Sequence, residues 1–449
     1  MVLEVKSLGL LEESLGVLEQ SFKEMPAFEA KPLGDRERDI LLRVAERMQD
    51  NYPYPHPLYA GQMLKPPHPI ARLAYMLSMW VNPNNHALDG GRASSALEKE
   101  AVAEIAAMFG WDQFLGHLTG GGTMANMEAL WVSGRLQPGK RILASSMAHY
   151  THGRISEVLQ LPFTAVAADE LARMDIAALE CELKKGDVGT VVVTLGTTGV
   201  GSVDPLHKVL ELKKQYGFRV HVDSAYGGYF GLVDNLETNA ATAYSQLNEV
   251  DSIVIDPHKH GLQPYGCGCV LFRDASVGRF YKHDSPYTYF SSDDMHLGEI
   301  TLECSRAGAS AVALWATQKL LPLHKGGEFA NGLANGREAA LALYKCLQDD
   351  PKYKTTFEPE LDILIWAPEA KSTQEISKQS QALFNLAEKN HLHLALLELP
   401  LSLAKACWGD SVEYNSETVS CLRSTLMKPE HLEWVAEIKR IMDESLAGI

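Results

Sequence analysis

Short apolar segments alternate with helical segments through the middle of the chain. Five runs are short and apolar enough for buried strands: 141–146, 189–195, 218–223, 252–256 and 268–273. Residues 170–184 and 205–216 lie between them and have helical spacing. This alternation predicts a mostly parallel sheet with helices on both faces. The interval between 252–256 and 268–273 cannot hold a crossover helix, so these two strands should be antiparallel.

The two ends of the chain have different patterns. Leucines recur near helical spacing in the first 20 residues, and a second amphipathic stretch covers 36–49, before a proline-rich connector. The later pattern predicts helices at 68–80, 95–109, 301–323, 327–348, 372–389 and 429–446, and strands at 361–366, 393–398 and 420–427. We therefore expect an N-terminal helical arm (1–56), a large domain (57–325) and a small α+β C-terminal domain (326–449).

Charge and cysteine usage narrow the possible partners. The chain has 41 basic and 57 acidic residues, a net charge of −16, which disfavours nucleic acid and anionic membranes. Apolar runs do not reach the roughly 18 residues of a membrane span, and the first 20 residues do not resemble a signal peptide. The seven cysteines lack metal-ligand spacing. We expect a cytoplasmic protein with reduced thiols and no metal site.

A lysine follows the apolar run 252–255, in the sequence Asp256-Pro257-His258-Lys259. Ligands of open α/β folds bind at the carboxyl ends of the strands, which is where this lysine should lie. A partly desolvated lysine amine is nucleophilic and can form a Schiff base. The alternative is an ordinary solvated lysine after a strand.

Two other segments supply complementary chemistry. The strand 218–223 ends on Asp223, and a carboxylate there can keep the ring nitrogen of pyridoxal phosphate (PLP) protonated; the alternative is a helix-capping aspartate. Small Ala225 leaves room for a flat ring. Gly122 and Thr123 end a glycine cluster at the start of a helix, which can cradle a phosphate or be a plain turn. The cluster matches neither the P-loop nor the dinucleotide motif, which argues against ATP and NAD.

His149 follows the strand 141–146, and its ring could lie flat on an aromatic cofactor or be a structural histidine. Taken together, these segments resemble the group II PLP-dependent amino-acid decarboxylases of fold type I. The resemblance rests on Asp-Pro-His-Lys, Gly-Gly-Thr-x-Ala-Asn, Leu-Gly-Thr-Thr (195–198) and Val-Asp-x-Ala, and it runs from about Pro57 to the C-terminus. It implies the fold-type-I PLP-dependent transferase fold, an α/β fold with a mostly parallel central sheet.

The resemblance also implies roles for individual residues. Lys259 would carry PLP as a Schiff base, Asp223 would hold the pyridine proton, and His149 would stack opposite Ala225. Thr197 would hydrogen-bond the phenolic oxygen, Gly122 and Thr123 would grip the phosphate, and His258 would add a donor. A tyrosine on a mobile loop would protonate Cα; Tyr287 and Tyr289, in the irregular stretch 282–298, are the candidates. The alternative for each is an ordinary aromatic side chain in a loop.

Substrate and assembly are less defined. Loops near His86 border the substrate pocket in the family, and Arg423 could clamp a carboxylate, by a looser analogy with other fold-type-I enzymes, or pair at the surface. Enzymes of the family often use such an N-terminal arm to embrace a partner subunit, so the resemblance suggests a homodimer; the alternative is a helix packed on its own subunit. Aromatic, acidic and basic amino acids all remain possible substrates; Arg306 or Arg423 facing the pocket would favour an acidic one.

The expected reaction is PLP-dependent decarboxylation of an L-amino acid to its amine, that is, a carboxy-lyase. Two other reactions use the same scaffold: carbon–carbon (aldehyde) lyase chemistry and amino transfer. The related lyases tend toward Gly-His-Lys, so Pro257 favours decarboxylation. A non-catalytic PLP-binding regulator is the remaining alternative, and the chemically competent residues argue against it.

Overall fold

The computed structural model describes residues 3–282 and 295–449. Its main sheet has seven strands in the order β1-β7-β6-β5-β4-β2-β3. These are β1 (Leu115–Thr119), β2 (Arg141–Ser145), β3 (Phe163–Val166), β4 (Val188–Thr194), β5 (Arg219–Asp223), β6 (Ser252–Ile255) and β7 (Gly268–Phe272). Strands β2 to β6 are parallel, and β7 runs antiparallel to both β6 and β1. The predicted α/β fold and the antiparallel pair are confirmed.

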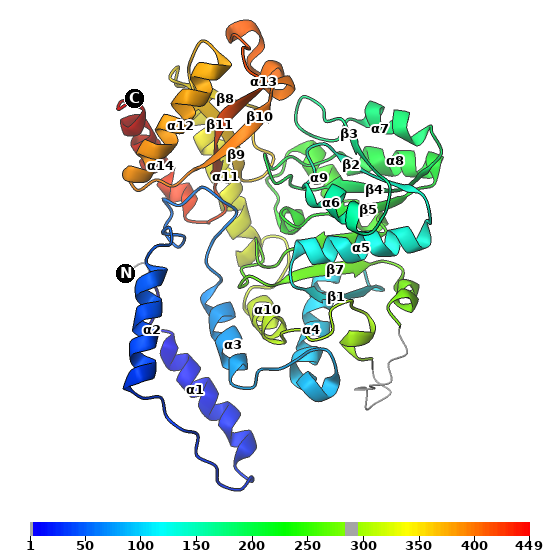
Figure 1. Cartoon of the computed structure of the whole chain (residues 1–449), viewed down its shortest axis with the longest axis vertical. Coiled ribbons are helices and arrows are strands. Elements are labelled where there is room, and N and C mark those ends of the chain that lie inside the picture. Colours follow the sequence, from blue (N-terminus) through cyan, green and yellow to red (C-terminus); the bar gives the residue numbers. More distant parts are fainter. Residues whose placement is uncertain (1–2, 283–294) are drawn as a thin grey trace.

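Helices flank this sheet on both faces (Figure 1). Those that pack on its strands are α4 (Leu88–Met108), α5 (Gly122–Leu136), α6 (Thr151–Val158), α7 (Ile176–Leu183) and α8 (Leu206–Tyr216). Outside them, α9 (Thr238–Tyr244) packs on α8, α10 (Ala309–Leu320) on α4, and α3 (Pro69–Met79) on α10. Helix α5 packs across β6 and β7. The parallel strands are almost wholly buried, as strands covered on both faces must be.

Two predicted helices are shorter than expected. Residues 170–175 are not helical, because the Asp169 carboxylate accepts the backbone N–H of Leu171 and Arg173 and holds a turn there. Asp175 then caps α7 by accepting the N–H of Ala178. Before α10, residues 301–308 are also irregular, and Asn84 accepts the N–H of Arg306. Local side-chain to backbone bonds therefore override the apolar pattern.

The C-terminal lobe has a four-stranded antiparallel sheet in the order β10-β11-β9-β8. Its elements are α11 (Glu328–Gln348), β8 (Tyr353–Thr355), β9 (Ile363–Pro368), α12 (Thr373–Lys389), β10 (Ala395–Pro400), α13 (Leu401–Trp408), β11 (Thr418–Thr425) and α14 (His431–Leu446). The expected boundaries at 56/57 and 325/326 stay predictions; the second falls between α10 and α11.

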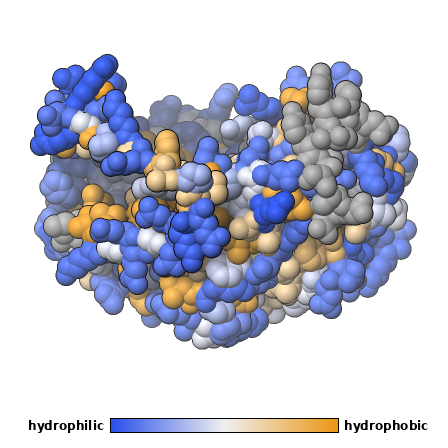
Figure 2. Space-filling view, turned by 90° about the horizontal axis from the view of Figure 1, so that it is seen from below, coloured by the Kyte–Doolittle hydropathy of each residue, from blue (hydrophilic) through white to orange (hydrophobic). Residues whose placement is uncertain are grey.

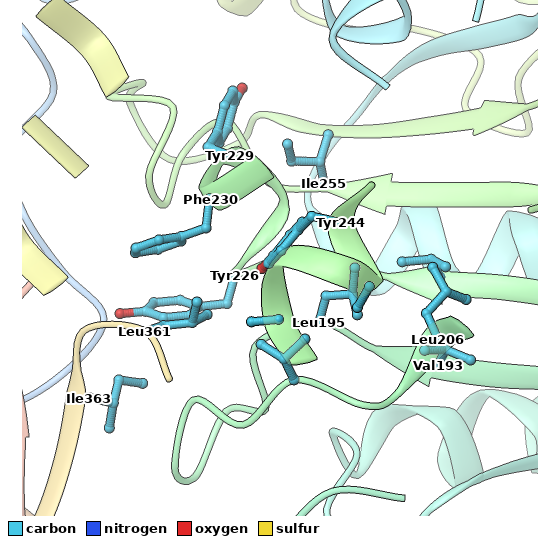
Figure 3. Packing of buried hydrophobic residues seen from close by; sticks show 14 of the residues in the cluster. Val193, Leu195, Leu206, Tyr226, Tyr229, Phe230, Tyr244, Ile255, Leu361 and Ile363 are labelled. Atoms are coloured by element: carbon cyan, nitrogen blue, oxygen red, sulfur yellow. The ribbon is translucent and has the colours of Figure 1, made fainter. Parts of the chain in front are cut away.

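The two lobes share buried side chains beside the strand ends. Tyr226 and Tyr244, from the large lobe, belong to the same apolar cluster as Leu361 and Ile363 (Figure 3). The Tyr226 hydroxyl donates to Asp362 Oδ1 at 2.6 Å, in the segment that leads into β9. The carboxyl edge of the main sheet is therefore tied to the small lobe by packing and by a buried hydrogen bond.

The N-terminal segment consists of α1 (Leu8–Glu19) and α2 (Asp35–Met48) and extends away from the rest of the chain (Figure 1). Helix α1 packs on α3 and buries Leu11. No residue of α2 is buried, although Ile40, Leu41 and Val44 are apolar. This arm leaves apolar side chains in water within a single chain.

Candidate active site

The carboxyl ends of β4, β5 and β6 open into one cavity of about 620 Å³. Parallel strands end at the same edge of a sheet, so the side chains that follow them meet there. The lining contains Gly120, Gly121, Gly122, Thr123, Met124, Asn126, Met127, His149, Thr151, Thr194, Gly196, Thr198, Asp223, Ala225, Tyr226, Asp256, His258 and Lys259. The glycine cluster, His149, Asp223 and Lys259, which are spread over residues 120–259 of the sequence, thus face one space.

Asp223 is held as a carboxylate by three donors. His152 Nε2 lies 2.8 Å from Oδ2, Asn126 Nδ2 lies 3.3 Å from Oδ2, and the N–H of Ala225 lies 3.1 Å from Oδ1. Burial opposes the charge, but the hydrogen bond and charge of His152, with the Lys259 ammonium, outweigh it and hold the pKa of Asp223 well below its ordinary value. Asp223 is therefore ionised at neutral pH.

A second layer of buried polar groups orients Asn126. His221 Nε2 contacts Asn126 Oδ1 at 2.8 Å, and His221 Nδ1 contacts Ser252 Oγ at 2.9 Å. Burial lowers the pKa of His221 to about 3, so this ring is neutral and donates one proton to Asn126 or Ser252. Asn126, His152 and His221 are site residues that the sequence pattern does not indicate. His152 lies one helical turn after His149, which was the available clue.

Lys259 lies at the base of the cavity. Its Nζ is 3.1 Å from Asp256 Oδ2, and its side chain keeps 21% of its surface exposed while that of Asp256 keeps 3%. The same carboxylate lies 3.6 Å from His258 Nε2, and burial lowers the pKa of His258. The lysine amine is thus both fixed in direction and reachable from the cavity.

The glycine cluster lies beside this lysine at the start of α5. Gly121 has a φ of +148°, which favours glycine, and a Cβ at Gly122 would lie 2.6 Å from Asp256 Oδ2. Free backbone N–H groups at a helix start attract a phosphate. Phosphate cradle, ionised carboxylate and reachable lysine face one cavity, so the residues fit PLP.

His149 and Ala225 both line the cavity, where the resemblance would set them on opposite faces of a ring. His149 Nδ1 contacts Thr151 Oγ1 at 2.8 Å, which fixes the imidazole plane. Burial lowers the pKa of His149, so its ring is neutral at pH 7. A neutral, fixed imidazole suits stacking better than proton transfer.

Other predicted residues have different places. Thr197 is fully buried, and its Oγ1 accepts the N–H of Ser202, while Thr198 lines the cavity instead. His86 lies against Gly298, outside the lining described above. Arg306 is committed to Glu98 at 2.8 Å and to the Leu118 carbonyl. Tyr287 and Tyr289 lie outside the described residues.

Arg423 lies behind the cavity wall and is 7% exposed. Its guanidinium donates to the carbonyl of Thr198 at 3.1 Å and to Gln62 Oε1 at 2.7 Å. Its Nε has no hydrogen-bond partner within the described part of the chain. Burial lowers the pKa of Arg423, and a carboxylate at this wall would restore its pairing.

Three comparisons place this arrangement among known proteins. The family model described as the pyridoxal-dependent decarboxylase conserved domain matches residues 35–366. A probable L-tyrosine/L-aspartate decarboxylase of Methanothermobacter thermautotrophicus is 28% identical over 331 residues, covering 72% of this chain and 86% of that protein. The L-aspartate decarboxylase of Thermococcus kodakarensis is 27% identical over 353 residues, covering 78% and 88%. The crystal structure of mouse CSAD has a TM-score of 0.78 at 19% identity, covering 96% and 91%.

Proposed function

Because the chain belongs to the pyridoxal-dependent decarboxylase family, we propose a specific substrate class for it, the aromatic L-amino acids, with L-tyrosine first. The predicted activity, PLP-dependent decarboxylation of an amino acid, is confirmed by the family match and by relatives that are amino-acid decarboxylases. The cofactor is PLP.

Bound PLP supplies an electron sink for the bond that breaks between Cα and the carboxylate. The residues of the chain would do the rest. Lys259 would hold the cofactor covalently, Asp223 would keep a proton on its ring nitrogen, and Gly122 and Thr123 would bind its phosphate. His149 would cover one face of the ring and exclude water there, and Arg423 would orient the substrate carboxylate.

The charges around the cavity support an aromatic substrate. Among the described lining residues, Lys259 is the single lysine or arginine, and PLP would occupy it. Arg423 remains for the α-carboxylate, while Arg306, which would have favoured an acidic substrate, is paired with Glu98. A second carboxylate, on an aspartate side chain, would lack a counter-charge there, and an unpaired buried charge is costly. L-aspartate is the second candidate because both relatives described above have L-aspartate in their names.

We predict that kcat/KM for L-tyrosine exceeds that for L-aspartate by at least about tenfold, since the aspartate side chain would be desolvated without a partner. Carbon dioxide release from each amino acid, with added PLP, measures the ratio. An Arg423→Met variant should lose activity on both, because both carry an α-carboxylate. Faster release from L-aspartate would contradict the aromatic assignment.

We also propose that the protein is a homodimer with composite active sites, in which Tyr287 or Tyr289 delivers the proton across the dimer. The support is the exposed apolar surface of a single chain. Ile40, Leu41 and Val44 on α2 are at least half exposed, and Phe28, between α1 and α2, is 92% exposed. Apolar patches also mark the face seen in Figure 2. A second copy would cover such surface.

Mixed dimers test this arrangement. Lys259→Ala subunits and Tyr287→Phe/Tyr289→Phe subunits should each be inactive alone. If the tyrosine acts across the dimer, a hybrid has one complete site, and random pairing restores about a quarter of the wild-type activity. No recovery from hybrids that light scattering identifies as dimers would place the tyrosine in its own subunit, and an active monomer would remove the dimer proposal.

We propose the cytoplasm as the compartment of this enzyme. All seven cysteines are free thiols, which suits a reducing environment. None of the helices described is both long and apolar enough to cross a bilayer. Cell fractionation with antibody detection checks the compartment, and recovery of the enzyme with the membrane or secreted fraction would contradict it.

A further inference from the structure

A second cavity, of about 500 Å³, lies on the other side of the segment that carries Lys259. Its wall includes Lys65 and Lys428, from parts of the chain 363 residues apart, and the buried ring of His260. None of these three residues has a role in the decarboxylation proposed for the first cavity. The composition of this wall points to a ligand of its own.

Two lysines bring positive charge to the inner part of this cavity. Lys428 is 4% exposed, and its Nζ donates to the carbonyl of Tyr59 at 2.6 Å; Lys65 Nζ donates to the carbonyl of Met427 at 3.0 Å. Burial lowers the pKa of Lys65 to about 8 and that of Lys428 to about 7. A carbonyl does not neutralise an ammonium group, so a bound anion would stabilise the charged form of each lysine.

Three helices begin at the same wall, which adds to its positive potential. His68 and Pro69 at the start of α3, Glu328 and Phe329 at the start of α11, and Pro429 and Glu430 just before α14 all line the cavity. The N-terminal ends of helices carry partial positive charge and attract anions. Glu328 and Glu430 are exposed at this wall, whereas Lys65 is partly buried and Lys428 is buried. Glu430 is close enough to act on both lysines, but its carboxylate remains in water.

Two buried polar atoms at this wall, both on the His260 ring, lack a hydrogen-bond partner within the described residues. His260 is 1% exposed, and its Nε2 lies 3.3 Å from Asp362 Oδ2 without forming a hydrogen bond. Leu262, Leu321 and Leu333 supply apolar surface beside it. The cavity thus combines an anion-attracting end, a buried imidazole without hydrogen-bond partners in the described part of the chain, and room for an apolar group.

We propose that this second cavity binds a small carboxylate with an apolar body, its anionic group held between Lys65 and Lys428. A bare inorganic anion would leave the leucine surface uncovered, and an amine without a carboxylate would meet two lysines. The ligand would contact the same segment as the cofactor, because His258 and Lys259 face the first cavity while His260 and Leu262 face the second.

A second connection joins the two cavities. Tyr226, which Figure 3 shows beside Leu361, lines the PLP cavity. Its hydroxyl donates to Asp362. The Asp362 carboxylate is electrostatically coupled to Lys65. Neutralising Lys65 with a bound anion would therefore act on a residue in contact with the active site. The PLP-loaded enzyme is accordingly the form in which binding should be measured.

Calorimetric titration of the PLP-loaded Arg423→Met protein with 3-phenylpropionate tests the proposal, because that variant removes carboxylate binding at the active site. We expect saturable binding that weakens at least tenfold when Lys428→Met or Lys65→Met is added. Lys208→Met, at an exposed position on α8, is the matched control and should leave the affinity unchanged. Equal affinity in the Lys428→Met and control proteins would overturn the site.

Labelling of wild-type protein gives a test that does not depend on how any variant folds. With acetic anhydride at pH 8, 3-phenylpropionate should reduce acetylation of Lys65 and Lys428 several-fold, while Lys208 is unaffected. Absence of protection would overturn the proposal, and so would equal protection by inorganic phosphate or by 3-phenylpropan-1-ol, since neither combines a carboxylate with an apolar body.

Discussion

The Lys259→Ala protein is expected to lose decarboxylase activity by about a thousandfold or more, which corresponds to about 4 kcal/mol of barrier. Lys259 Nζ is the reachable amine in the cavity, held 3.1 Å from Asp256. Without it, PLP has no covalent attachment, and the visible absorbance band of the PLP-loaded enzyme should disappear. Carbon dioxide release and the absorbance spectrum, measured on the same sample, check both expectations.

The matched control for this prediction is Lys208→Ala, which removes an exposed lysine of α8 and should retain both activity and absorbance. Noncovalent binding of PLP by the Lys259→Ala protein should persist, because the glycine cluster and Asp223 are intact. Treatment with borohydride is decisive: a PLP adduct that can still be trapped in Lys259→Ala would mean that another lysine carries the cofactor.

The sequence predicts those elements that the local pattern of apolar residues determines. Buried parallel strands are continuous apolar runs, so β2, β4, β5, β6 and β7 were found close to their true bounds. The edge strands β1 and β3 were missed. Strand β1 is five residues long and pairs with β7, about 150 residues later. Tertiary contacts with β7, rather than the local sequence, therefore determine that β1 is a strand. Strand β3 has only four residues and is partly exposed, so its apolar pattern is weak.

The same distinction explains the site. Lys259, Asp223 and the glycine cluster sit in contiguous motifs at strand or helix ends, and topology alone brings those ends together. His152 and Asn126 act on Asp223 across 71 and 97 residues of sequence, and such contacts follow from the packing of α5 and α6 rather than from any local pattern. Lys65 and Lys428 are 363 residues apart in the sequence, so a local pattern could not indicate that they line one cavity. Thr197 and Thr198 cannot be told apart from the sequence: Thr197 is buried and bonded to Ser202, whereas Thr198 lines the cavity.

The Asp223→Asn protein is expected to turn over at least about a hundredfold more slowly, about 3 kcal/mol of barrier, with PLP still bound. An asparagine has one acceptor oxygen where the carboxylate has two, and it carries no charge. His152, Asn126 and Ala225 now donate to both carboxylate oxygens, so the amide nitrogen would face a donor. The ring nitrogen of PLP would lose the negative charge that keeps it protonated.

Asp187→Asn is the control on the neighbouring strand. Asp187 immediately precedes β4, at the amino ends of the strands, away from the cavity, and pairs there with Arg141. Its replacement should leave turnover unchanged. Single-turnover carbon dioxide release separates a slower chemical step from weaker binding of substrate. If Asp223→Asn and Asp187→Asn proteins, both loaded with PLP, release carbon dioxide at the same rate, then Asp223 is not the group that holds the pyridine proton, and its three donors serve only the fold.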